Sequence, residues 1–138
     1  MKRYERNSPE ALSRIVAMMM ITDATLDDRE LEVLERLHVL DIVGISREGF
    51  SRVVQDYCAA LIDEGSARGR INLVDRQRID WVIDPVDDPR KRIDVCGIVL
   101  NIAKADGRLH DSELAVFGYM LERWGMTLES LGRELASQ

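Results

Sequence analysis

The chain has 138 residues, of which 46% are hydrophobic and 32% charged, so it is long enough to bury a core and too apolar to be disordered. Its net charge of −6 disfavours general binding to the phosphate backbone of nucleic acids. The N-terminus is charged and the apolar runs are short, so neither a secretory signal nor a membrane-spanning helix is predicted. We therefore expect a cytoplasmic protein.

The spacing of the apolar residues predicts an all-α fold of about seven helices. Capping signals mark several ends: Ser8 stands before Pro9, Asp27 lies three residues before Glu30, and Gly125 follows the sixth helix. In chain order, the predicted helices span about residues 8–22, 28–40, 46–62, 71–84, 88–105, 111–124 and 127–135.

Two of these helices, at 8–22 and 88–105, are apolar nearly all round, which indicates that both are buried at the centre. A glycine-containing loop near residues 65–70 and the turn at 84–89 divide the chain into halves of similar length. We expect one compact domain over residues 8–136, with halves at 8–62 and 88–136. Cys58 and Cys96 are expected to be reduced, buried thiols, and Trp81 and Trp124 to anchor the core.

The two halves contain a repeated segment. Residues 23–31 read D-A-T-L-D-D-R-E-L and residues 106–114 read D-G-R-L-H-D-S-E-L, so that five of nine positions match at an offset of 83. The matching pairs are Asp23/Asp106, Leu26/Leu109, Asp28/Asp111, Glu30/Glu113 and Leu31/Leu114. Downstream, G-I-S-R-E-G-F at 44–50 parallels G-M-T-L-E-S-L at 125–131. The sequence therefore predicts two copies of a helix–acidic turn–helix unit.

The repeated turns concentrate carboxylates, which are the ligands that hard cations such as calcium, magnesium or manganese prefer. The candidate ligands are Asp23, Asp27, Asp28 and Glu30 in the first turn and Asp106, Asp111 and Glu113 in the second. Neither turn has the ligand spacing of an EF-hand. The alternative interpretation is that these carboxylates cap their helices and stay solvated. His110 could add a nitrogen ligand to the second turn.

The segment I-A-K-A-D-G-R-L-H-D-S-E-L (102–114) resembles the signature of the TerB-like family, which is named for a tellurite-resistance protein. The matching first half, at 18–31, agrees with the internal duplication of that family. The resemblance implies an all-helical bacterial domain without known catalytic activity, associated with tellurite resistance and stress response. It also implies divalent-metal binding at Asp106 and Glu113, and at Asp23 and Glu30. The first half departs from the motif at Ala24, where the second has a glycine.

We therefore expect a non-enzymatic module that binds a metal ion or a protein partner, at a membrane-associated or stress-response assembly. One alternative is a carboxylate-dependent, hydrolase-type enzyme, although a nucleophile elbow, a phosphate loop and a zinc-binding helix are all missing. Another is a purely structural protein–protein interaction domain without metal. Nucleic-acid binding through the arginines at 68–78 or 90–92 is not expected, because aromatic residues are not interleaved with them. These arginines are predicted to form solvated or salt-bridged faces.

Overall fold

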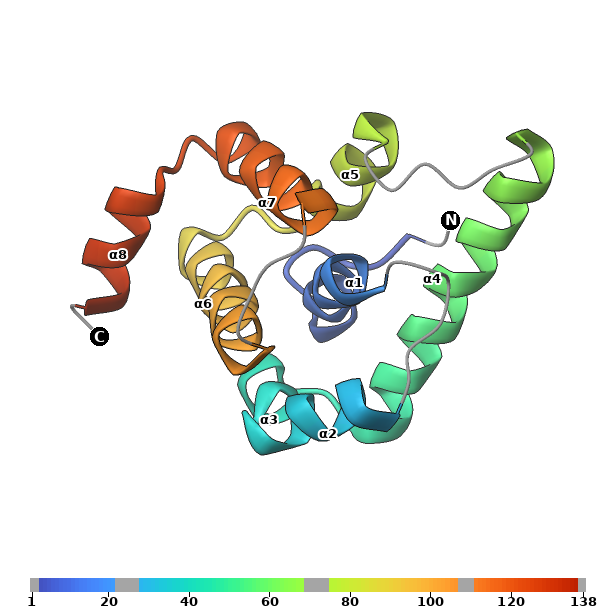
Figure 1. Ribbon diagram of the computed structural model, residues 1–138, viewed down its shortest axis with the longest axis horizontal. Helices are drawn as coiled ribbons and strands as arrows, with labels where there is room; N and C mark the ends of the chain where they lie inside the picture. The colour runs from blue at the N-terminus through green and yellow to red at the C-terminus, as the bar shows by residue number, and fades with distance from the viewer. Residues whose placement is uncertain (1–2, 22–27, 69–74, 107–110, 137–138) are drawn as a thin grey trace.

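The computed structural model describes residues 3–21, 28–68, 75–106 and 111–136. For residues 28–31, 64–68, 105–106 and 111–112 it describes only the backbone. Over these ranges the chain forms eight helices and no strand (Figure 1), which confirms the predicted all-α class. The helices are α1 (Pro9–Met20), α2 (Asp28–Arg36), α3 (Val39–Val43), α4 (Arg47–Arg68), α5 (Arg76–Ile83), α6 (Pro89–Asp106), α7 (Asp111–Arg123) and α8 (Leu128–Ala136).

Helix α1 lies at the centre, and the other helices except α8 surround it (Figure 1). It begins where the Ser8 hydroxyl accepts a hydrogen bond from the backbone N–H of Ala11 at 3.1 Å, with Pro9 as its first residue. Nine consecutive residues, Ala11 to Met19, are buried. The prediction of a central buried helix is therefore confirmed for α1.

Each of the eight described helices is too short or too polar to cross a bilayer.

Helix α6 begins at Pro89 as predicted, and Asp88 caps it by accepting from the N–H of Arg90 at 2.9 Å. Its apolar side, which includes Val95 and Val99, packs into the core, but Asn101 and Lys104 are exposed. Helix α6 is thus amphipathic rather than buried all round, because α8 covers only part of its outer surface.

The predicted helix at 28–40 is divided into α2 and α3. The break is at His38, which has a left-handed φ of 56° and an exposed side chain. After this break α3 begins, and its residues Val39 and Val43 are buried. The apolar spacing could not reveal the break, because apolar residues continue on both sides of it.

The chain forms the same kind of turn at Gly44, after α3, and at Gly125, after α7. Both glycines have a positive φ, 83° and 67°, the left-handed conformation that often ends a helix. In each turn the N–H of the following residue donates to a carbonyl five residues back. These bonds join Ile45 to Leu40 at 3.1 Å and Met126 to Leu121 at 2.9 Å.

The helices that follow these glycines, α4 and α8, also begin alike. In each, the hydroxyl of the capping residue accepts a hydrogen bond from the backbone N–H three residues later. The next residue along the chain is large, apolar and fully buried. The hydroxyl bonds are Ser46 to Gly49 and Thr127 to Ser130, both at 3.0 Å, and the buried residues are Phe50 and Leu131. Helix α8 packs mainly on α6, at the outer edge of the molecule (Figure 1).

Other sequence predictions need correction. Helix α4 continues through Gly65 to Arg68, so residues 65–68 do not form the predicted loop. One glycine costs a helix only about 1 kcal/mol, which the packing of a long helix can exceed.

Both cysteines are reduced. Cys96 is buried and its burial raises its pKa to about 12, whereas Cys58 is only half-buried.

Candidate functional site

The predicted acidic turns lie largely outside the described residues. This holds for Asp23, Asp27 and His110 altogether, and for the side chains of Asp28, Glu30, Asp106 and Asp111. The described part of α2 starts at Asp28 and that of α7 at Asp111, in each case directly after residues outside the described ranges. Glu30 lies in α2 and Glu113 in α7, and the Glu113 side chain is half-buried.

Carboxylates in the first turn of a helix lie near its positive end, which favours their ionised form. Capping and cation binding both use that form, so these positions agree with either interpretation. Among the side chains that the structure describes, no three acidic, histidine or cysteine groups lie close enough together to hold a metal ion.

A second candidate site lies where the N-terminal segment crosses the turn between α5 and α6. Asn7 joins the two segments: its side-chain amide donates to Asp87 Oδ1 at 2.7 Å, and its Oδ1 accepts from the N–H groups of Asp87 and Asp88, both at 3.0 Å. The Asn7 N–H also donates to the carbonyl of Pro85 at 2.9 Å. Asn7 has a φ of 58°, a conformation that asparagine tolerates better than most residues.

Arg6 strengthens the same crossing. Its guanidinium donates to the carbonyl of Asp84 at 3.1 Å and to the carboxylate of Asp87 at 3.2 Å. The Asn7 hydrogen bond, and then the Arg6 charge, lower the pKa of Asp87, although its burial acts in the opposite direction. Residues 3–7 are therefore held in place beside α5, although about 80 residues of chain separate the two segments.

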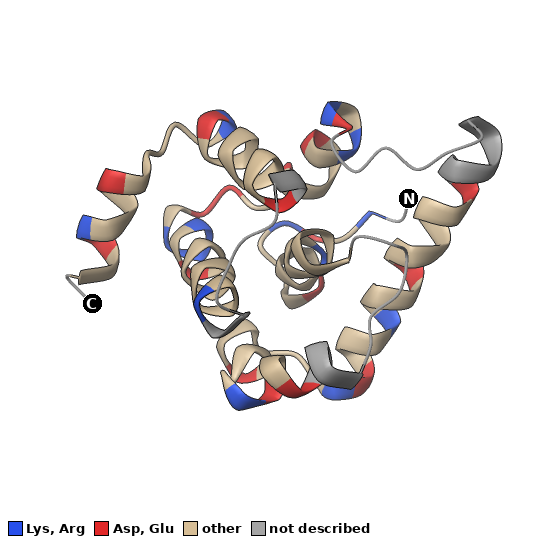
Figure 2. Cartoon of the chain, in the orientation of Figure 1, with Lys and Arg blue, Asp and Glu red and all other residues tan. Residues whose placement is uncertain are grey.

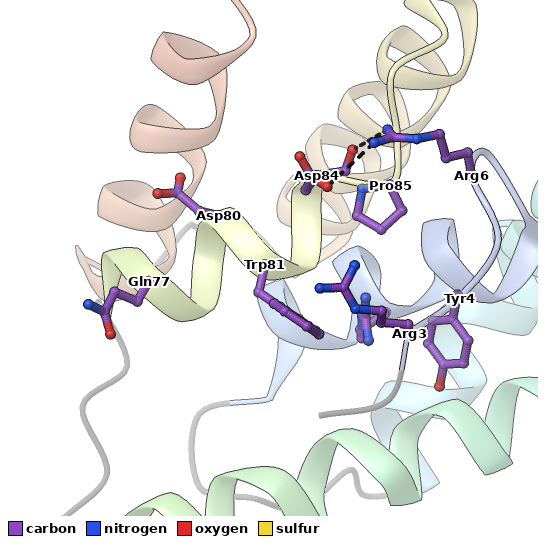
Figure 3. A pocket seen from close by; sticks show the side chains of 9 residues that line it. Arg3, Tyr4, Arg6, Gln77, Asp80, Trp81, Asp84 and Pro85 are labelled. Carbon is purple, nitrogen blue, oxygen red and sulfur yellow. Dashed lines mark hydrogen bonds and ion pairs between the residues drawn. The ribbon is translucent and has the colours of Figure 1, made fainter.

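Beside this crossing is a cavity of about 430 Å³ (Figure 3), a volume typical of small-molecule sites. Three arginines, Arg3, Arg6 and Arg14, contribute to its lining together with Tyr4 and Trp81. The guanidinium carbon of Arg3 lies 4.4 Å from the centre of the Trp81 ring, and that of Arg14 lies 4.5 Å from the centre of the Tyr4 ring. Arg3 is drawn between Trp81 and Tyr4 in Figure 3.

Arg14, which also lines the cavity, is a buried cation. It belongs to the buried face of α1 and is only 1% exposed. Burial lowers its pKa, and the phenols of Tyr4 and Tyr57 act in the opposite direction. Arginine stays protonated at neutral pH, so a positive charge is buried at the floor of the cavity.

Two carboxylates, Asp80 and Asp84, also line the cavity, and each has a cationic partner. Asp84 pairs with Arg6 at 3.7 Å. Asp80 pairs with Arg123 at 3.2 Å and accepts a hydrogen bond from the Tyr119 hydroxyl at 2.9 Å, which raises the pKa of that tyrosine. The lining therefore has three arginines and two carboxylates.

A neighbouring hollow of about 370 Å³ shares Arg3 and Tyr4 with this cavity. Its lining includes three carboxylates, from Glu5, Glu10 and Asp56, and a second arginine, Arg52. Burial, and next the charge of Asp56, raise the pKa of Tyr4, whose hydroxyl donates a hydrogen bond to that carboxylate. The N-terminal segment thus lines both hollows, of which the first has more arginines than carboxylates and the second more carboxylates than arginines.

Sequence reasoning did not find the cavity lined by Arg3 and Trp81. Trp81 was expected to be a core anchor, but it is 37% exposed because Arg3, rather than the core, covers part of its ring. Trp124 is buried as predicted. The available signal was Arg14, a cation in the otherwise apolar run of α1.

The described arginines at 76–78 and 90–92 are not all on solvated faces. Arg78 is buried, and Arg92 lies 5.1 Å from the Trp124 ring centre while its Nε donates to the carbonyl of Val86 at 2.9 Å. On the outer helices, basic and acidic residues are interspersed (Figure 2).

Comparison with known proteins finds no match to a family model, to a curated protein or to a solved structure. Membership of the TerB-like family remains a prediction from residues 102–114 and their counterpart in the first half.

Proposed function

We propose that this chain is a non-enzymatic, TerB-like binding module of a bacterial stress response that includes tellurite resistance. Its two acidic turns hold a divalent cation or the basic groups of a protein partner. The observation that carries this proposal is the repeated acidic segment. Residues 23–31 and 106–114 match at five of nine positions at an offset of 83.

The glycine turns support a duplicated architecture independently of the acidic residues. Gly44 and Gly125 are separated by 81 positions, and so are the serine and threonine that cap α4 and α8. Similar hydrogen bonds at both places agree with two copies of one ancestral unit. Two copies would present two acidic turns with related chemistry.

The chemistry of the turns suits a hard cation. Calcium takes six to eight oxygen ligands and magnesium six, and the first turn carries four carboxylates within eight residues, 23–30. Aspartate and glutamate are ordinarily ionised at neutral pH, so protonation does not compete with a cation. The same charges would attract lysine and arginine side chains of a partner.

Calorimetric titration of the whole chain with calcium, magnesium and manganese tests the metal version. We expect a saturable heat that Asp106→Asn and Glu113→Gln each weaken by about tenfold or more, as expected when a ligand is lost. Glu48→Gln is the matched control, because Glu48 is an exposed carboxylate in the first turn of α4. Equal losses in all three variants, or no heat with the wild-type protein, would exclude metal binding at these turns.

A titration with a lysine-rich peptide tests the partner version. Binding that Glu113→Gln weakens and Glu48→Gln does not would support it. A hydrolase-type enzyme would instead turn over ester or phosphoester substrates, with a rate that depends on Glu113 or Asp106. Such turnover would replace the binding proposal.

A further inference from the structure

The N-terminal segment, residues 3–7, lies outside the buried core. None of its side chains is fully buried, whereas the buried core begins at Ala11. Its only hydrophobic side chain, Tyr4, is half-buried and packs against the core from outside. The helices therefore keep their buried contacts when this segment is displaced, so it can open locally without unfolding the rest of the molecule.

One end of the segment is held by polar contacts with the turn at residues 84–88. The ion pairs of Arg6 with Asp84 and Asp87 join side chains that are 60%, 72% and 50% exposed. Water and salt compete with such contacts, so each contributes little by itself. The backbone acts against them, because Asn7 has a φ of 58°. This left-handed conformation costs free energy, which opening of the segment releases.

The other end of the segment contacts two different helices. The Tyr4 hydroxyl donates a hydrogen bond to Asp56 of α4, and the Arg3 guanidinium stacks on Trp81 of α5 at 4.4 Å from the ring centre. Tyr4, Arg3 and Trp81 all line the cavity of about 430 Å³ (Figure 3). Displacement of the segment removes one wall of this cavity and uncovers the face of the Trp81 ring on which Arg3 stacks.

We propose that residues 3–7 form a gate that opens as one unit while the helices stay folded, and that its opening gives access to Trp81 and to the α5 side of the cavity. The structure shows the closed state. The hydrogen bonds of Asn7 to residues 85–88 are the latch of this gate. Because charged groups surround the latch, screening of charge shifts the gate toward the open state. This gate does not depend on the proposed function of the acidic turns.

Hydrogen exchange of the latch amides in the whole chain tests the proposal. The N–H of Asn7 donates to the carbonyl of Pro85, and those of Asp87 and Asp88 donate to Asn7 Oδ1. If one opening exposes all three amides, their protection factors should agree within about threefold and lie well below those of the amides in the middle of α1.

Two variants test whether the segment moves as a unit. Tyr4→Phe removes the hydrogen bond to Asp56, which is not part of the latch. It should nevertheless lower the protection of all three latch amides by about threefold to tenfold, because the whole gate loses that bond. Arg6→Gln, at an exposed side chain, should act in the same way. Arg133→Gln is the matched control, since it changes an exposed arginine of α8, and it should leave the latch amides unchanged.

Trp81 reports on the same motion at the other end of the segment. The chain has two tryptophans, and Trp124 is only 9% exposed. In a proton–nitrogen NMR spectrum, both variants and added sodium chloride should move the indole N–H signal of Trp81 in one common direction. The signal of Trp124 should change little.

Three results would overturn the proposal. Protection factors that differ by more than about tenfold among the latch amides would show separate fluctuations instead of one opening. Protection as high as that in α1 would show that the segment opens only with global unfolding. Wild-type exchange of the latch amides in the Tyr4→Phe protein would show that the two ends of the segment move independently.

Discussion

Asn7 connects the N-terminal segment to the turn between α5 and α6 through one short side chain. Its amide both donates and accepts, so it satisfies two backbone N–H groups and a carboxylate at once. The positive φ of Asn7 directs the chain into this crossing. An asparagine tolerates that conformation better than most other residues, which explains why this residue type suits the position.

We expect Asn7→Ala to lower the free energy of unfolding by about 1–3 kcal/mol, because it removes the side-chain hydrogen bonds and leaves alanine at a positive φ. Urea denaturation measures the change. Asn101→Ala, an exposed change on α6, should alter stability by less than about 0.5 kcal/mol. Asn7→Gly separates the two causes, since glycine restores the backbone conformation without the side chain.

The same variant has a signature in the titration of Asp87. Its folded pKa is lowered, so its ionised form contributes stability above the unfolded pKa of about 4, and this contribution is lost as pH falls through the folded value. In Asn7→Ala the pKa of Asp87 should rise toward its usual range. Carbon-detected NMR of the carboxyl group measures this. An unchanged pKa would mean that Arg6, not Asn7, sets it.

Two helix turns offer a matched test among the glycines. Gly44 and Gly125 have a positive φ, and a Cβ added at either would meet no atom within 4 Å, so the penalty of a side chain is conformational alone. Gly44→Ala and Gly125→Ala should each lower the free energy of unfolding by about 1–2 kcal/mol.

Gly118 provides the opposite control, because it is exposed within α7 and a Cβ there also meets no atom within 4 Å. Gly118→Ala should stabilise the protein by about 0.5–1 kcal/mol. Thermal and urea unfolding of the three variants compare them directly. A neutral Gly125→Ala beside a destabilising Gly44→Ala would contradict the similarity of the two turns.

The helices also show which signals in a sequence are reliable. Ser8-Pro9 and Asp88-Pro89 predicted the starts of α1 and α6 correctly, since capping depends on residues within one turn. Gly65 did not end α4, and His38 divided a predicted helix in two. In both cases packing outweighed the local preference of the residue, which a periodic pattern does not record.

The molecule depends on α1 as its common core element, since α3, α4, α5, α6 and α7 all contact it. Ile15 is fully buried in this helix. Ile15→Ala should lower the free energy of unfolding by about 2–5 kcal/mol and speed amide hydrogen exchange in all of these helices.

Helix α8 packs mainly on α6 and should behave differently. Leu131→Ala, which removes its fully buried side chain, should speed exchange in α8 well before the helices around α1. Hydrogen-exchange mass spectrometry distinguishes the two patterns. Equal protection losses across the chain for both variants would show that α8 unfolds only with the rest of the molecule.

The sequence does not predict the cavity lined by Arg3 and Trp81. Its apolar pattern predicts Trp81 in the core, because such a pattern does not tell which apolar residues the rest of the fold leaves uncovered. Arg14 interrupts an apolar run, which marks a buried cation. Arg3, which also lines the cavity, has no such feature in the sequence around it.

The helical class and the position of α1 follow from composition, periodicity and caps, because these express interactions within a few residues of chain. The acidic residues of each turn are likewise close together in the sequence, so they could be identified from it. The cavity depends instead on bonds between residues 6–7 and 84–88, whose partners are about 80 positions apart. Such a meeting is decided by how the helices pack around the core, so the tertiary structure was needed to find it.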